Sequence, residues 1–282
     1  MNNRVILISD GQANVGETRA DALARHASEL RARGVTTATL GIGEDFNEGV
    51  MSAIANGGGG PAHFARVPQE IPEAIAGCIQ EALDVTLRSA RISIELPGAD
   101  FQVLSAGDVL ARRGECHINL GDLAADQVRE VVVRLRLPKG TDGAQARAVV
   151  RLAGRSERGQ IAVQSSVAWT YAGNLANDAQ PRVVEVDRVV AAHFAAIARE
   201  RATALNRDGE YKLAREELEK IARRIETYAN GDVELVGLAA SLWSDAREWS
   251  RQRTELERKA QYYLGFRYRM SRDSDGQLRR GR

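Results

Sequence analysis

One aspartate stands where its carboxylate could do chemistry. Asp10 closely follows the apolar run Val5–Ile8, which is typical of a parallel strand buried on both faces. Open α/β sheets bind ligands at the carboxyl ends of their strands, and a carboxylate there can hold a hard cation through oxygen. Ser-Asp-Gly is also an ordinary turn sequence, so a purely conformational role for Asp10 stays open.

A second loop is expected at the same end of the sheet. Gly41-Ile-Gly43 closes the next predicted strand and is followed by two acidic residues. We interpret this loop and the one after Asp10 as a binding rim, with a tight loop that binds nothing as the alternative. The predicted rim consists of Gly11, Asn14, Gly43, Glu44 and Asp45.

No other residues form a catalytic or metal-ligating motif. The four histidines are scattered, and each is expected to be a surface or hydrogen-bonded residue: His26, His63, His117 and His193. Cys78 and Cys116 have no metal-ligand spacing and cannot form a disulfide framework. The glycines at 57–60 lack a following Gly-Lys-Ser/Thr, so they are expected to end a helix. We therefore expect no enzyme.

The elements that must position Asp10 lie in residues 1–87. Apolar periodicity predicts strands over residues 5–8, 35–42 and 63–65, and helices over about 18–33, 47–56 and 68–87. Alternating strands and helices predict a parallel sheet with right-handed crossovers.

Residues 88–173 change to a period of two. The clearest run is Ile161, Val163, Ser165, Val167, Trp169 and Tyr171. Turn dipeptides such as Pro97-Gly98 and Asp142-Gly143 separate these runs, which predicts an antiparallel β-sandwich.

Residues 174–181 are polar and are expected to be a linker, and residues 182–282 are predicted to be helical. Apolar stripes over 186–197, 211–228 and 235–263 suggest three helices, forming a hairpin, a small bundle or a coiled coil with a partner. Arg253 interrupts the last stripe, and the arginine-rich tail from Leu264 is expected to fray. The predicted fold class is mixed: α/β, then β, then α.

The composition excludes several kinds of partner. Lys+Arg is 39 and Asp+Glu is 38, so no global field attracts nucleic acid or an acidic membrane. No stretch approaches the roughly 18 apolar residues of a membrane span, and residues 1–10 lack the features of a signal peptide. As written, the chain is expected to be soluble and cytoplasmic; its localisation is unknown if an N-terminal segment is missing.

Three stretches carry a family resemblance. Residues 4–16 (RVILISDGQANVG) resemble the fourth strand and following loop of bacterial von Willebrand factor A (vWA) domains. Residues 34–47 (GVTTATLGIGEDFN) resemble the fifth strand and its loop, and residues 51–56 with the glycines after them resemble what comes next. The resemblance covers about residues 4–87 and implies half of a vWA sheet. Residues 88–173 are similar to the domain that often follows in such bacterial proteins.

The resemblance implies a metal-ion-dependent adhesion site. In that family Mg²⁺ is held by an Asp-x-Ser-x-Ser motif on the first strand, a Thr in a middle loop and an Asp after the fourth strand. Only the last ligand has a match here, and it is Asp10. Because Mg²⁺ needs near-octahedral oxygen ligation, we expect this chain alone to bind it no better than an ordinary exposed aspartate.

The family's strand order also implies that Val5–Ile8 has lost its inner neighbour. Either the chain is a fragment of a longer protein, which we favour, or a partner completes its sheet. The leading hypothesis is a protein–protein interaction module that in its full-length form captures a partner's carboxylate through Mg²⁺. The alternative is a structural scaffold that oligomerises through the C-terminal helices. Self-association is expected through either the Val5–Ile8 edge or those helices.

Overall fold

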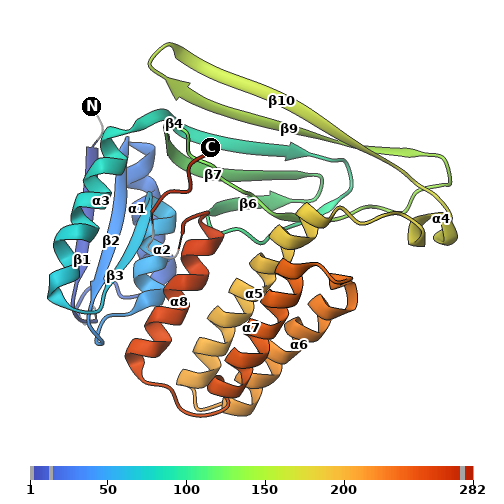
Figure 1. Cartoon of the computed structure of the whole chain (residues 1–282). Coiled ribbons are helices and arrows are strands. Elements are labelled where there is room, and N and C mark those ends of the chain that lie inside the picture. Colours follow the sequence, from blue (N-terminus) through green and yellow to red (C-terminus); the bar gives the residue numbers. More distant parts are fainter. Residues whose placement is uncertain (1–2, 13–14, 274–276, 282) are drawn as a thin grey trace.

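The computed structural model describes residues 3–12, 15–273 and 277–281. A parallel α/β part comes first, an antiparallel sandwich follows, and helices complete the chain (Figure 1). The predicted fold class is therefore confirmed.

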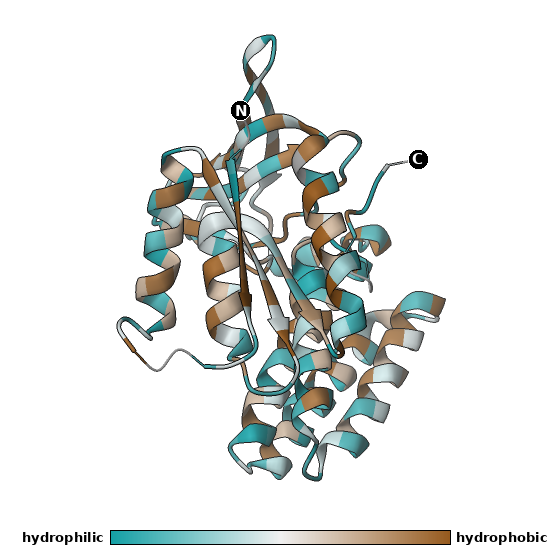
Figure 2. Cartoon of the chain, turned by 90° about the vertical axis from the view of Figure 1, so that its left-hand side faces the viewer, coloured by the Kyte–Doolittle hydropathy of each residue, from teal (hydrophilic) through white to brown (hydrophobic). Residues whose placement is uncertain are grey.

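The α/β part is a three-stranded parallel sheet in the order β1-β2-β3. Its elements are β1 (Asn3–Ser9), α1 (Ala20–Ala32), β2 (Val35–Ile42), α2 (Glu48–Gly58), β3 (Gly59–Ala65), the 3-10 helix η1 (Pro68–Glu70) and α3 (Ile71–Leu83). Helices α1 and α2 cover one face of the sheet and α3 covers the other (Figures 1 and 2). Gly34, with φ +84°, follows α1 as predicted for the end of a helix.

Three boundaries in this part differ clearly from the prediction. Helix α2 runs through Gly57 and Gly58 and ends at Gly59, whose φ of +71° is left-handed, so the glycines do end the helix. Strand β3 starts at once and is longer than residues 63–65. Helix α3 was expected to reach Leu87 but ends at Leu83, because Val85 and Leu87 pair with β7 of the sandwich. The proposed division at residues 87 and 88 stays a prediction.

Strand β1 lies at the edge of the sheet. Within the described residues it pairs only with β2, from Asn3 opposite Val35 to Ser9 opposite Gly41. Its large apolar residues are partly in solvent: Val5 is 44%, Leu7 38% and Ile8 45% exposed. Figure 2 views the sheet from this side and shows the apolar colour of the strand. Strand β1 thus has the apolar composition of a buried strand but lies at an open edge of the sheet.

The sandwich pairs a five-stranded sheet, β10-β9-β4-β7-β6, with a two-stranded sheet, β5-β8. Its strands are β4 (Val85–Glu95), β5 (Asp100–Val103), β6 (Asp108–Arg112), β7 (Glu115–Ala124), β8 (Val133–Arg136), β9 (Gln145–Ser156) and β10 (Gly159–Thr170). Ile94, Ile118 and Ala148 of the larger sheet pack against Phe101 and Leu135 of the smaller one. This core explains the period of two in β4, β7 and β9, because alternate residues face the second layer. In the clearest predicted run, which forms β10, every residue except Trp169 is exposed, so burial does not account for its alternation.

The helical region differs from the prediction in two places. Its helices are α4 (Asn174–Asp178), α5 (Val184–Arg207), α6 (Tyr211–Ala229), α7 (Val233–Trp249) and α8 (Glu255–Arg269). The expected linker therefore contains α4, and the single stripe over 235–263 is two helices. Arg253 lies in the loop between them, and Thr254 then starts α8 with a capping box to Glu257. In the described part of the chain, no helix has both the length and the apolar character needed to cross a membrane.

Helix α8 packs along α5 and also contacts the α/β part. Leu218, Ile225 and Leu242 lie in the shared core of α5, α6 and α7. Tyr263 and Phe266 of α8 instead join a core with residues of the α/β part, including Phe46, Met51 and Ala62. The helical region therefore supports the sheet as well as itself.

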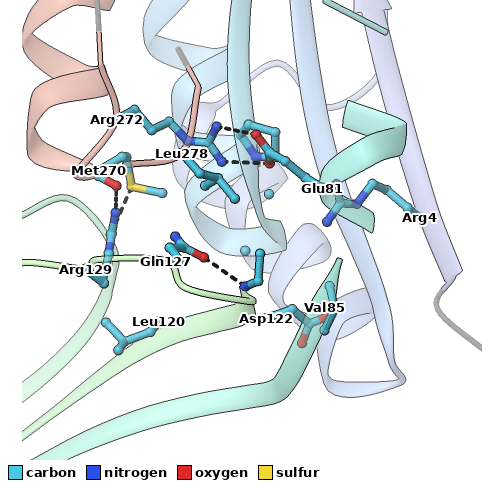
Figure 3. Close-up of a pocket in the computed structure, with 14 residues that line it drawn as sticks. Arg4, Glu81, Val85, Leu120, Asp122, Gln127, Arg129, Met270, Arg272 and Leu278 are labelled. Carbon is cyan, nitrogen blue, oxygen red and sulfur yellow. Dashed lines mark hydrogen bonds and ion pairs between the residues drawn. The ribbon is translucent and has the colours of Figure 1, made fainter. Parts of the chain in front are cut away.

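The arginine-rich tail is ordered where it is described, contrary to the expectation that it frays. Arg272 is buried and its guanidinium makes a bidentate ion pair with Glu81 of α3, at 2.6 and 2.9 Å. Figure 3 shows this pair beside Arg129, which donates hydrogen bonds to the Met270 carbonyl and, at 2.9 Å, to the Ala106 carbonyl. Further along, the amide of Gly281 donates to the Asp126 carbonyl. The tail therefore contacts both the α/β part and the sandwich, and the charge of Arg272 has a partner inside the protein.

Candidate functional site

Asp10 lies at the carboxyl end of β1, as predicted. Ser9, the residue before it, is the last of the strand and stands opposite Gly41 of β2. The Ser9 hydroxyl donates to the Gly11 carbonyl at 2.8 Å and fixes the turn. The Asp10 side chain is exposed and has no hydrogen-bond or ion-pair partner among the described residues. Its carboxylate is therefore held by a turn and is free to meet a ligand.

The predicted rim is brought to the same end of the sheet. Gly43 has a left-handed φ of +70°, and its amide donates to the Ala65 carbonyl at the end of β3, at 3.0 Å. Glu44 and Asp45 follow it and are both exposed. Gly11 is half-buried beside Asp10. Asn14, the remaining predicted rim residue, lies outside the described residues.

The loop after β2 is fixed from below by the helical region. Phe46 is buried, with its ring centroid 5.8 Å from that of Phe64 and 6.2 Å from that of Tyr263. The Lys259 ammonium of α8 donates to the Phe46 carbonyl at 2.5 Å and lies 3.1 Å from the Glu48 carboxylate. Lys259 is 2% and Glu48 3% exposed, so this ion pair is taken out of water. The exposed carboxylates of Glu44 and Asp45 thus sit on a rigid base.

Two further contacts hold this base in place. Arg207 of α5 binds the second oxygen of Glu48 at 2.5 Å. Gly41 leaves room for the Phe46 ring, because a Cβ on Gly41 would lie 2.2 Å from it. The close approach explains why glycine occupies the penultimate position of β2.

A groove of about 840 Å³ opens beside the carboxyl end of β3, between α3, α7 and α8. Its lining is mixed: charged side chains such as Arg66 and Glu248 lie beside apolar ones such as Trp249. Arg253 in the same wall pairs with Glu257 at 2.8 Å. Protein–protein interfaces have such a mixture of polar and apolar surface, whereas small-molecule sites are mostly apolar.

The donor set does not fit a complete Mg²⁺ site. Within the described residues, no group of three or more His, Cys, Asp or Glu side chains is arranged to hold a metal ion. Asp10 offers one carboxylate, whereas Mg²⁺ demands octahedral coordination by oxygens. The site instead presents the exposed carboxylates of Asp10, Glu44 and Asp45.

The histidines have different environments. His193 is fully buried and hydrogen-bonded to the Ser105 hydroxyl at 3.1 Å and the Val189 carbonyl at 2.9 Å. His117 is beside Glu115 at 2.7 Å. His63 is also buried, but its Nε2 has no partner among the described residues, contrary to the expectation of a surface or hydrogen-bonded side chain. Burial, assisted by the Arg272 charge, lowers the pKa of His63 to about 4.

The two cysteines are buried and unpaired. Burial raises the pKa of the Cys78 thiol to about 11, with a smaller contribution from Glu81. The thiolate is the reactive form, and burial disfavours it at Cys78 at neutral pH.

Lys259, Phe46 and Glu48 support the rim and were not found from the sequence. Lysine is almost never fully buried unless it is paired, and here its partner Glu48 lies 211 residues away in the chain. No spacing rule joins residues so far apart, and Lys259 occurs in an ordinary charged stretch of helix.

Comparison with known proteins gives fold similarity without a family assignment. No family model matches the chain. An uncharacterised protein, sll0103 of Synechocystis sp. (strain ATCC 27184 / PCC 6803 / Kazusa), is 24% identical over 196 residues, which is 65% of this chain and 43% of that protein.

Among solved structures, the von Willebrand factor type A protein from Catenulispora acidiphila is similar at a TM-score of 0.62 and 16% identity, covering 82% of this chain and 56% of that one. The VWA2 paralog of ArnB from Sulfolobus acidocaldarius has a TM-score of 0.48 at 15% identity, covering 90% of this chain and 66% of that one. The chain spans about half the length of the first two proteins. The comparison supports a vWA-like fold.

Proposed function

We propose that this chain is a protein-binding module of the vWA kind that acts by binding and not by catalysis. The observation that carries the proposal is the exposed, unpaired Asp10 carboxylate at the carboxyl end of β1 in a vWA-like fold. Ligands of open α/β sheets bind at that end. The groove beside β3, with its mixed charged and apolar lining, would extend the contact with the partner.

The metal-dependent form of the proposal needs more ligands than this sequence has. An Asp-x-Ser-x-Ser motif does not occur in the 282 residues. In a longer form that carried it, Asp10 would act directly or through a water, and the open position on Mg²⁺ would take a carboxylate from the partner. This chain alone would then bind its partner weakly, because the exposed carboxylates of the rim act without a shared cation.

The alternative hypothesis is an oligomeric scaffold that assembles through the C-terminal helices. The apolar stripes expected to mediate that assembly instead form the core of the chain's own helical bundle, where Leu218, Leu235 and Leu242 are buried. A scaffold would therefore have to use another surface. No contact among the described residues favours these apolar stripes as an assembly surface.

The test compares Asp10→Asn with Asp142→Asn in affinity capture from native extracts, followed by quantitative mass spectrometry. Asp142 is a matched control because it is exposed and also precedes a glycine, but it lies on the sandwich. We expect Asp10→Asn to lower enrichment of specific partners about tenfold and Asp142→Asn to leave it unchanged. Equal enrichment by both variants and the wild type would refute a role for Asp10. Repeating the capture with EDTA in place of Mg²⁺ tests the metal-dependent form separately.

A further inference from the structure

The outermost strand of the sandwich has a free edge. Among the described strands, β10 pairs only with β9, and Figure 1 draws it along the rim of the sandwich with no element beyond it. Every residue of β10 except Trp169 is exposed. A strand of twelve residues with an open row of backbone donors and acceptors is a template for another strand.

One face of β10 lies in line with the core-facing residues of its neighbour β9. Val163 stands opposite Leu152, and Val167 stands opposite the core residue Ala148. Trp169 packs against the sandwich core, but Ile161 is 43%, Val163 56% and Val167 49% exposed. An apolar face that continues the sandwich core is therefore left in solvent beside a free edge.

Nothing in the sequence of β10 protects that edge. Gly159–Thr170 contains no proline and no charged residue, although 27% of the chain is charged. Edge strands that stay unpaired usually carry lysine, proline or a bulge. A neutral strand also offers no charge with which to select an acidic or basic partner.

The order of residues in β10 reads alike in both directions about Ser165. Ala162 mirrors Ala168, Val163 mirrors Val167, and on either side Ile161 mirrors Trp169. Outside them the polar Gln160 mirrors Thr170, and inside them Gln164 mirrors Ser166. In a two-fold antiparallel pair, each residue stands opposite its mirror position in the other copy. The sequence of β10 is thus self-complementary on both faces.

We propose that two copies of this chain pair through β10 in antiparallel orientation, with the two-fold axis at Ser165. The five-stranded sheets of the two copies then form one continuous sheet across the β10 strands. Val163 of each copy lies beside Val167 of the other, and Ile161 lies beside Trp169. The pairing shields the apolar residues laterally and satisfies the free backbone groups. It does not involve Asp10, so it stands or falls apart from the proposed function.

A cysteine placed on the two-fold axis tests the pairing directly. Directly opposite residues have Cα atoms about 4.5–5.5 Å apart, which is within the range of a disulfide. We expect Ser165→Cys to give a covalent dimer on mild oxidation. Gln160→Cys is the control. In this register, residue 160 of one copy lies about 34 Å from residue 160 of the other copy. Both native cysteines are buried and do not compete. Equal crosslinking of the two variants, or none with Ser165→Cys, would overturn the proposal; a dimer formed through β1 gives the second result.

A charge exchange tests the register in the full chain. Val163→Lys/Val167→Lys places like charges opposite each other twice, whereas Val163→Lys/Val167→Glu places opposite charges there and removes the same two valines. Sedimentation equilibrium should show that the Lys/Glu variant dimerises at least about tenfold more tightly than the Lys/Lys variant. Equal dimerisation constants would contradict the register. A wild-type protein that stays monomeric at about 100 μM would contradict the dimer itself.

Discussion

Removing the buried ammonium of Lys259 should measure how strongly the helical region holds the rim. Lys259→Met keeps most of the side-chain volume but removes the partner of the Glu48 carboxylate, which is 3% exposed. It also removes the donor to the Phe46 carbonyl. Removing one partner of a buried ion pair costs about 3–5 kcal/mol.

The low end of that range applies here. Arg207 remains 2.5 Å from Glu48 and still compensates part of its charge, although Arg207 is 38% exposed and partly screened by water. We therefore expect Lys259→Met to lower the free energy of unfolding by about 3 kcal/mol. Adding Glu48→Gln to Lys259→Met should recover part of the loss, because no unpaired anion is then buried.

Urea unfolding followed by circular dichroism provides the assay. Lys212→Met is the matched control, since Lys212 is exposed and lies 3.8 Å from Glu216 in a surface pair. That pair should contribute less than about 0.5 kcal/mol. A loss of under about 1 kcal/mol for Lys259→Met would refute the reasoning that the pair fixes the loop. A double variant no more stable than Lys259→Met would refute the role of the buried charge.

Two further predictions concern the residues around this loop and the junction. Gly41→Ala should lower the free energy of unfolding by about 1–3 kcal/mol, because its Cβ would meet the Phe46 ring at 2.2 Å. Gly173→Ala is the control: the space around its Cβ is open, so the free energy of unfolding should change by less than about 0.5 kcal/mol. Equal effects of the two substitutions in urea unfolding would contradict the steric argument. His63 has a folded pKa of about 4, below the ordinary histidine value of about 6.5. The unfolded chain therefore binds the extra proton between these values, and stability should fall by up to about 3 kcal/mol as the pH drops from 6.5 to 4. His63→Leu should flatten this dependence in urea titrations at pH 6.5 and 4.5, and an unchanged slope would show that other groups cause it.

Local patterns predicted the elements well where one face of an element meets one core. The strand over residues 35–42 has the predicted bounds, because its apolar and Thr-rich run is buried along almost all of its length. The stripe over residues 235–263 failed because α7 and α8 each bury one face at a compatible spacing. The Thr254-x-x-Glu257 capping box was present in the sequence and marks the start of the second helix.

The candidate site divides in the same way. Asp10 could be placed from the strand before it and from the resemblance to vWA domains. The support of the rim could not, since Lys259 and Glu48 meet only through tertiary packing. The tail failed for the same reason: its arginines read as solvated until Glu81 and Glu130, more than a hundred residues earlier, are placed beside them.

The joining of α8 to the α/β part also sets the order in which the molecule can be completed during synthesis. Glu48 leaves the ribosome long before Lys259, because 211 residues separate them. At about 5–20 residues per second, translation of that stretch takes on the order of 10–40 s. During this interval Phe46 and Met51 lack their packing partners Tyr263 and Phe266, which have not yet been synthesised. The nascent chain therefore holds an unfinished apolar surface for seconds, and its yield should depend on how well the cell shields that surface until the last helix emerges.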